Sequence, residues 1–188
     1  MKRILSIILT LFILSGTVFA QSESDEYDDG FVYEQNGAGD QFIKIKLGAI
    51  FPLNFDGQLN PGGQIELGYY RFLNNWLAVG GEFLASYEVS IGNKILVLLP
   101  FSAGVMFQPT YNDFEFPIYV NLGLGYETWQ SMDYFPSFVF KTSAGAYYRL
   151  NEICSFGLDT SWMLLHEGSN KSFTANFLTL SIGARYHF

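Results

Sequence analysis

Cysteine and basic residues are scarce in this sequence. Cys154 is the single cysteine of the 188-residue chain, so no intramolecular disulfide framework can hold the fold together. Ten Lys and Arg stand against 18 Asp and Glu, which leaves no basic patch of the kind that nucleic-acid binding needs. The two histidines, His166 and His187, make no metal site, and His187 falls within a strand pattern. We therefore expect no nucleic-acid partner, no metal and no cofactor.

Long hydrophobic runs are lacking after the N-terminal segment. The one such run, residues 4–14, follows Lys2 and Arg3 and precedes small residues that end at Ala20. This order predicts a signal peptide, residues 1–20, that is cleaved after Ala20. A membrane anchor would need about twenty apolar residues, and no cysteine follows the cleavage site to carry a lipid. The remaining chain can cross a membrane only as a closed barrel, because it offers no segment for a transmembrane helix.

Positive charge is absent from residues 21–40. The segment holds seven acidic residues: Glu23, Asp25, Glu26, Asp28, Asp29, Glu34 and Asp40. Such a composition predicts a solvated, disordered tail, which we place in the periplasm. Calcium binding is disfavoured because the EF-hand spacing, with its Gly and Glu positions, is missing. The pattern assigns no role to this tail or to Cys154.

The chain from residue 41 to residue 188 alternates apolar and small or polar residues in eight segments. The first is 42–51, the fourth (96–107) is apolar on both faces, and the last is 173–188. An even number of segments, each near the ten residues of a tilted membrane strand, predicts an all-β, eight-stranded antiparallel up-and-down transmembrane β-barrel. A soluble barrel would bury its apolar face, whereas here the polar face is rich in Gly and Ser and suits a crowded interior. Pro100 lies within the fourth segment, where we expect a bulge.

Aromatic residues gather towards the segment ends, as two bilayer interfaces favour. One predicted girdle contains Tyr69, Phe72, Trp76, Phe107, Phe116, Tyr148, Phe156, Tyr186 and Phe188. The other contains Phe51, Tyr87, Tyr126, Trp129, Tyr134, Phe135 and Phe173.

Two stretches carry a family resemblance. The last segment places Tyr186 and Phe188 on its apolar face, which resembles the terminal assembly signal of bacterial outer-membrane barrels that their insertion machinery reads. Residues 99–126, with Leu99-Pro100, a turn and a Gly-x-Gly-Tyr strand, are similar to the small outer-membrane barrels of the OmpA, OmpX and OmpW superfamily. The OmpW branch and small spirochaete barrels are the most similar. The resemblance spans residues 41–188 and implies an outer-membrane location, with membrane lipids and the insertion machinery as partners.

The inward face towards the periplasm is charged. Five inward bases (Lys44, Lys46, Lys141, Arg149, Arg185) match five inward acids (Glu66, Glu82, Glu88, Glu127, Asp159). Balanced charges in a narrow space should pair, because an unpaired buried charge costs several kcal/mol. We predict a salt-bridged plug made of Lys44, Lys46, Glu66, Glu82, Lys141, Arg149, Asp159 and Arg185.

The inward face towards the outside is apolar. Its candidate lining is Ile50, Leu84, Leu98, Pro100, Val139, Met163 and Phe177. One interpretation is dry packing that completes the plug and leaves a structural barrel. The other, which the OmpW resemblance implies, is a chamber through which a small hydrophobic solute passes into the bilayer.

Catalysis and surface interaction are further alternatives. His166, Glu167 and Ser169 share one short loop, but neighbouring loop residues seldom meet in catalytic geometry, so we predict no enzyme activity. Interaction or adhesion through the loops is the other alternative. Loops 54–63, 90–94, 129–136 and 166–171 carry no recognisable binding motif, so the sequence neither identifies nor excludes a partner.

Overall fold

The computed structural model describes residues 35–55, 59–90, 92, 95–129, 132–167 and 173–188. The predicted signal peptide and residues 21–34 of the predicted tail lie outside these residues, so both stay predictions. No helix with the length and apolar character for a membrane crossing occurs in the described residues.

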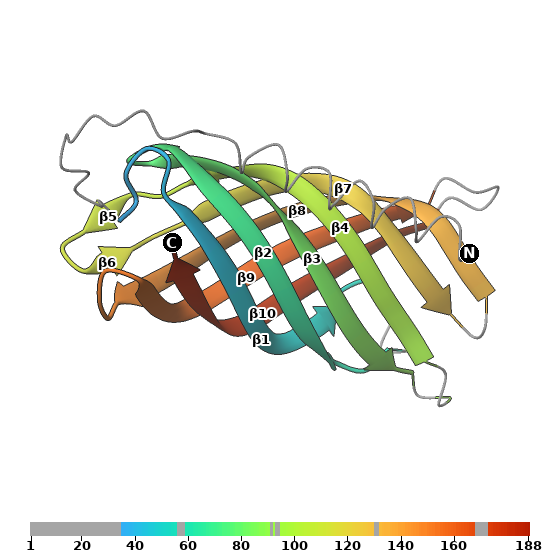
Figure 1. The fold of residues 1–188 in the computed structure, drawn as a ribbon. Helices are drawn as coiled ribbons and strands as arrows, with labels where there is room; N and C mark the ends of the chain where they lie inside the picture. The colour runs from blue at the N-terminus through green and yellow to red at the C-terminus, as the bar shows by residue number, and fades with distance from the viewer. Residues whose placement is uncertain (1–34, 56–58, 91, 93–94, 130–131, 168–172) are drawn as a thin grey trace, which may run out of the picture. The chain divides into compact units, whose positions relative to one another are not determined.

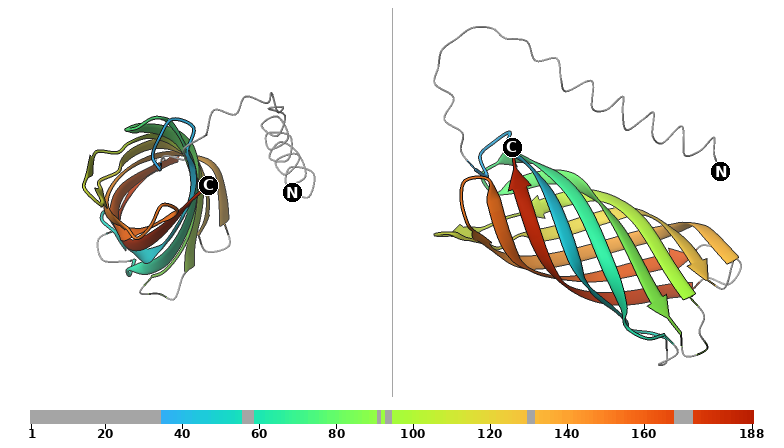
Figure 2. Two further views of the ribbon diagram at one scale, coloured as in Figure 1. Left: turned by 60° about the vertical axis from the view of Figure 1, so that its left-hand side comes forward. Right: turned by 60° about the horizontal axis from the view of Figure 1, so that its bottom comes forward.

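The described chain forms eight long strands and one short hairpin. The strands are β1 (Gln41–Pro52), β2 (Gly62–Asn74), β3 (Leu77–Val89), β4 (Ile95–Phe107), β5 (Thr110–Tyr111), β6 (Phe114–Glu115), β7 (Ile118–Trp129), β8 (Met132–Arg149), β9 (Cys154–Glu167) and β10 (Phe173–His187). Each long strand pairs antiparallel with the next long strand along the chain, and β1 pairs with β10. The sheet is therefore closed, as Figures 1 and 2 show, and the predicted eight-stranded antiparallel barrel is confirmed.

The barrel has two distinct ends. We call the end that holds residues 35–40, Phe188 and the β5–β6 hairpin the terminal end (Figure 1). The opposite end, where β1 connects to β2 and β3 connects to β4, is the loop end. By the predicted topology, the terminal end faces the periplasm and the loop end faces outward.

Strict alternation decides which face of each strand is inside. On β2, Ile65, Leu67 and Tyr69 are each about half exposed on the outer surface, whereas Glu66 and Tyr70 between them are fully buried. Successive strand residues point to opposite faces, so this period of two determines whether each side chain of the barrel wall points inward or outward. An apolar exterior around a polar interior is the arrangement of a membrane barrel, because lipid surrounds the outer face.

The predicted bulge at Pro100 is wrong. The register between β3 and β4 is the same on both sides of the proline, although the pairs that would join Leu84 and Ala85 to Pro100 and Leu99 are missing. On the other side β4 pairs without a break with β7, where Pro100 lies opposite Gly125. Proline has no N–H to donate, so the barrel loses ladder pairs on one side of β4 and keeps its register.

A register shift does occur one strand further along the barrel. Between the pairs Gly125–Ser137 and Glu127–Tyr134, the single residue Tyr126 of β7 faces two residues of β8. One of these two is Pro136, which is compatible with a bulge because the extra residue there is not required to donate to the ladder.

The aromatic girdle at the terminal end forms almost as predicted. Eight of its nine rings are 40–55% exposed on the outer surface, namely Tyr69, Trp76, Phe107, Phe116, Tyr148, Phe156, Tyr186 and Phe188. Phe72 is the exception: it is 1% exposed and its ring lies 5.9 Å from that of Phe42 inside the barrel. Its position two residues after inward Tyr70 explains this, because both share one face of β2.

The second girdle is only partly described. Tyr87 is 50% exposed on the outer face, and Phe51 and Tyr126 are half-buried. The side chains of Trp129, Tyr134, Phe135 and Phe173 lie outside what the structure describes.

Candidate functional site

The interior is arranged in layers along the barrel axis. Inward residues of β1 run Phe42, Lys44, Lys46, Gly48 and Ile50 from the terminal end to the loop end. Aromatic, charged and apolar side chains therefore follow one another along a single strand, and the neighbouring strands extend each layer around the barrel.

Six charged side chains form the central ion cluster: Lys44, Lys46, Glu66, Glu82, Lys141 and Asp159. They come from β1, β2, β3, β8 and β9, and each is at most 3% exposed at its side chain. All six belong to the predicted plug. Three positive and three negative charges make the cluster neutral as a whole.

Glu66 lies at the centre of this cluster. Its carboxylate contacts the amino groups of Lys46 at 2.7 Å and Lys44 at 3.3 Å, and it also accepts a hydrogen bond from Lys141. Glu82 shares two of these partners, because Lys44 and Lys141 each contact one of its oxygens. Breaking one buried ion pair typically costs about 3–5 kcal/mol. Because Glu66 and Glu82 share Lys44 and Lys141, loss of either carboxylate would remove a partner from both lysines.

Aromatic rings separate the ion cluster from the terminal end. The amino group of Lys44 lies 3.9 Å from the ring centroid of Tyr119, and the guanidinium of Arg185 lies 3.8 Å from that of Tyr147. Tyr70 donates a hydrogen bond of 2.9 Å to Glu82. Cations are attracted to ring faces, and more strongly away from water. The sequence placed Tyr70 and Tyr119 inward by alternation but gave no sign of this layer.

Arg149 and Arg185 do not join the central ion cluster. They contact Glu115 instead, at 3.1 Å and 3.2 Å respectively, and we call these three residues the terminal-end cluster. Arg185 also donates to Gln108 at 2.7 Å and to the hydroxyl of Tyr119 at 2.6 Å. The predicted plug thus divides into two clusters, and sequence reasoning missed Glu115 because it lies in a turn rather than in a long alternating strand.

Neighbouring side chains stabilise the charged form of the Glu115 carboxyl group. Burial would raise the pKa of its carboxyl, but the charge of Arg185 and the amide of Asn36 hold that pKa below its ordinary value. The amide of Asn36 donates to Glu115 at 2.8 Å.

Residues 35–40 close the terminal end. Asp40 accepts hydrogen bonds from the backbone N–H of Asn36 at 2.7 Å and from Nδ1 of His187 at 2.7 Å. The backbone of Asp40 also accepts from Phe72, and Gly39 donates back to Phe72. The acidic tail predicted for residues 21–40 therefore has an ordered end, with Asp40 6% exposed. His187 faces inward, as its strand pattern predicted.

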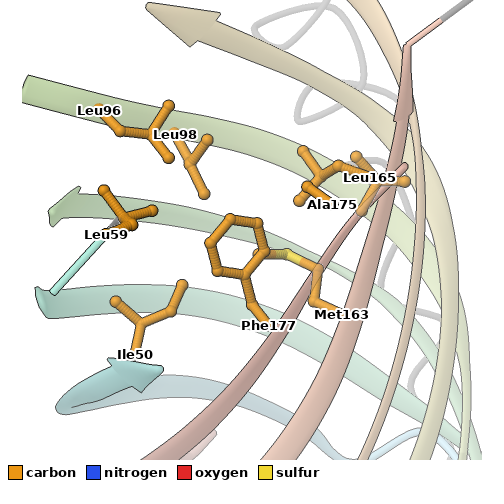
Figure 3. Close-up of a cluster of buried hydrophobic side chains, with 9 residues drawn as sticks. Ile50, Leu59, Leu96, Leu98, Met163, Leu165, Ala175 and Phe177 are labelled. Carbon is orange, nitrogen blue, oxygen red and sulfur yellow. The ribbon is translucent and has the colours of Figure 1, made fainter. Parts of the chain in front are cut away.

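The loop half of the interior holds the apolar cluster: Ile50, Leu59, Leu96, Leu98, Val139, Met163, Leu165, Ala175 and Phe177, each at most 5% exposed (Figure 3). The structure brings together five of the seven predicted lining residues. Leu84 and Pro100 are also buried but stand outside this cluster. Leu59 was not predicted, because it comes from the connection between β1 and β2 and not from a strand.

Tyr186, Phe188 and His166 lie on the surface of the barrel. Tyr186 and Phe188 lie on the outer surface at the terminal end with their rings 6.4 Å apart. His166 is exposed and its Nδ1 lies 2.9 Å from the hydroxyl of Thr174. The side chain of Glu167 and all of Ser169 lie outside the described residues. Among the described side chains, no three His, Cys, Asp or Glu are grouped to hold a metal ion.

Several solved structures share this architecture. Neisserial surface protein A matches with a TM-score of 0.68 and 13% identity, over 80% of this chain and 99% of that chain. The outer membrane protein OprG from Pseudomonas aeruginosa matches with a TM-score of 0.56 and 15% identity, over 82% and 99%. Ail, the attachment invasion locus protein of Yersinia pestis, matches with a TM-score of 0.52 and 17% identity, over 80% and 99%. At these identities the likeness shows the fold.

Sequence comparison gives two results. No curated protein matches the chain. A protein-family model matches residues 23–186, which is most of the chain. The chain therefore belongs to the family that this model describes, and its closed antiparallel barrel, its apolar exterior and its structural neighbours show the fold of the small eight-stranded outer-membrane β-barrels.

Proposed function

We propose that this protein is a structural outer-membrane barrel that is sealed against ions and holds its loop end at the cell surface. The observation that supports this role is the filled interior. Side chains of the central ion cluster are at most 3% exposed and those of the apolar cluster at most 5%, so neither layer offers water a path. An eight-stranded barrel is narrow enough for side chains to fill it.

Ion conductance tests this proposal directly. Refolded protein in planar lipid bilayers should leave the conductance at the level of the protein-free membrane. A variant with both Lys44→Ser and Glu82→Ser removes a complete ion pair and shortens two inward side chains, so it serves as a widened comparison. Heat-dependent gel mobility should show that both proteins are folded. Discrete conductance steps from the wild type would overturn the proposal.

Passage of small hydrophobic molecules is the second candidate. The apolar cluster supports it, because this half of the interior presents aliphatic and aromatic surface near the loop end. Uptake of an apolar solute into liposomes should then fall when Leu98→Asp places a charge in the cluster and persist when Leu98→Met conserves its volume. Equal uptake by both variants and by protein-free liposomes would exclude this role.

Partners follow from the same proposal. Outer-membrane lipids would surround the apolar exterior, and the insertion machinery would read Tyr186 and Phe188. Surface interaction is compatible with a sealed barrel, and one structural neighbour, Ail, is called an attachment invasion locus protein. Cells that display the folded barrel should then bind a surface that cells displaying a loop-shortened barrel do not. The predicted signal peptide would deliver the chain to this location.

A further inference from the structure

Glu88 differs from the other buried carboxylates of the interior. Glu66, Glu82, Asp159 and Glu115 each contact a lysine or arginine, and Asp40 contacts His187. Glu88 is 0% exposed on β3, and its hydrogen bond is the one that Oε1 accepts from the hydroxyl of Ser86 at 3.0 Å. Its Oε2 atom is buried without a hydrogen-bond partner. A buried carboxylate in this state is costly unless a positive charge or a proton neutralises it.

The described chain supplies no base for this position. Its inward-facing bases are Lys44, Lys46, Lys141, Arg149 and Arg185, and each of them contacts a carboxylate other than Glu88 in the two clusters nearer the terminal end. The balanced count made from the sequence included Glu88 among the five inward acids, although the predicted plug did not contain it. Glu115, which that count did not include, contacts Arg149 and Arg185, and Glu88 has no basic partner among the described side chains.

A second side chain beside Glu88 is also unsatisfied. Gln64 of β2 is 7% exposed, and both its amide oxygen and its amide nitrogen are buried without hydrogen-bond partners. Gln64 lies directly opposite Ser86 in the ladder between β2 and β3. Glu88 leans towards the same strand, because a methyl group added at Gly62 would lie 2.7 Å from its Cγ atom. Three polar side chains therefore share one inward patch of two adjacent strands.

Apolar side chains border this patch. In the ladder between β3 and β4, Leu96 lies opposite Glu88 and Leu98 lies opposite Ser86. Both leucines belong to the apolar cluster. A ligand that fits such surroundings carries one positive charge at one end and apolar carbon beside it.

We propose that Glu88, Gln64 and Ser86 form a binding site for the ammonium group of a primary alkylamine. Such a group carries one positive charge and three N–H donors, as the lysine side chain does. Oε2 of Glu88, the amide oxygen of Gln64 and the hydroxyl oxygen of Ser86 supply three acceptors and one negative charge. Leu96 and Leu98 contact the alkyl part.

Cation-dependent stability tests the site. Thermal unfolding of the refolded barrel in uncharged nanodiscs is followed by gel mobility while sodium is replaced, at constant ionic strength, by ethylammonium or by tetramethylammonium. A ligand that binds the folded state alone raises the unfolding midpoint. Ethylammonium should therefore raise the unfolding midpoint by about 2–4 °C when its concentration is roughly four to five times its Kd, and the rise should grow with the logarithm of the concentration beyond that point. Tetramethylammonium, which has no N–H donor, should give none.

Variants separate the site from a general salt effect. Glu88→Gln keeps the shape of the side chain and an acceptor for Ser86 but removes the charge, so its unfolding midpoint should not respond to ethylammonium. Asp113→Asn, at an exposed turn of the terminal end, is the matched control and should respond like the wild type. Equal rises with both organic cations, or a full response in the Glu88→Gln variant, would each overturn the proposal. None of these results depends on whether the barrel conducts ions.

Discussion

The two halves of the interior are filled in different ways. Towards the terminal end, charged groups and rings contact one another through defined atoms, such as the two carboxylate oxygens of Glu66 and three lysines. Towards the loop end, nine buried apolar side chains pack against one another (Figure 3). The first half depends on which atoms meet, and the second depends on volume.

This difference predicts opposite tolerances to substitution. A change that conserves shape but removes charge should be severe in the ion cluster, because it leaves a buried partner without compensation. A change that conserves volume should be mild in the apolar cluster, because dispersion contacts have no direction. Each of the following variants tests one side of this contrast.

The largest effect is expected from Glu66→Ala. Three buried lysines then lose a shared partner, and the free energy of unfolding in urea should fall by about 3–5 kcal/mol. Glu66→Gln, which has nearly the same shape, should lose much of the same stability. A loss below about 1 kcal/mol for both variants would mean that the cluster contributes little, as exposed ion pairs do.

Leu98→Ala tests the apolar half. Leu98 is 1% exposed, so removing its outer carbons should leave a cavity and lower the free energy of unfolding by about 3 kcal/mol. Leu98→Met is the control and should cost less than about 1.5 kcal/mol. The contrast between the halves fails if the methionine variant is as unstable as the alanine variant.

Asp40→Ala tests the closure of the terminal end. The variant removes the acceptor for His187 and for the backbone of Asn36, which should lower the free energy of unfolding by about 1–3 kcal/mol. Hydrogen exchange should quicken at the terminal end and stay unchanged near the apolar cluster. Asp113→Ala, at an exposed turn, should be neutral. Uniform changes in exchange along the barrel would contradict this local role.

The smallest effect is expected from protonation of the Glu115 carboxylate at low pH. Its folded pKa is lowered, so its contribution to stability is complete above the ordinary glutamate pKa of about 4.3 and is lost as the pH falls through the folded value. Measured from pH 7 down to pH 3, the stability of Glu115→Gln should therefore decline less steeply than that of the wild type. Parallel declines would show that Glu115 does not carry part of the acid sensitivity.

Alternation in the sequence was sufficient to predict most of the wall. It separated inward Glu66 from outward Ile65, and it brought Lys44, Lys46 and Asp159 to one face although 113 positions separate Lys46 from Asp159 along the chain. A period of two is a local property of an extended backbone, so a single sequence reveals it. Phe72 was assigned to the girdle from its position near a strand end, whereas its own alternation already placed it inside.

The missed features depend on contacts that no local pattern encodes. Glu115 reaches the interior through a two-residue strand, and Asp40 is one more acid in an acidic run until its contact with His187 is known. Pro100 suggested a bulge, yet whether a missing N–H shifts the register depends on the neighbouring strands, which keep theirs. The division of the predicted plug into two clusters follows from the depth of each residue, which alternation does not give.

Because β1 pairs with β10, the barrel closes only when both strands are present. Phe42 pairs with His187 and Pro52 with Phe177, so the first and the last long strands meet along their whole length. A chain that stops before β10 would leave β1 and β9 as open edges, with unpaired N–H and C=O groups facing lipid, where such groups cost several kcal/mol each. A chain shortened in this way would therefore form no smaller barrel, because its sheet could not close.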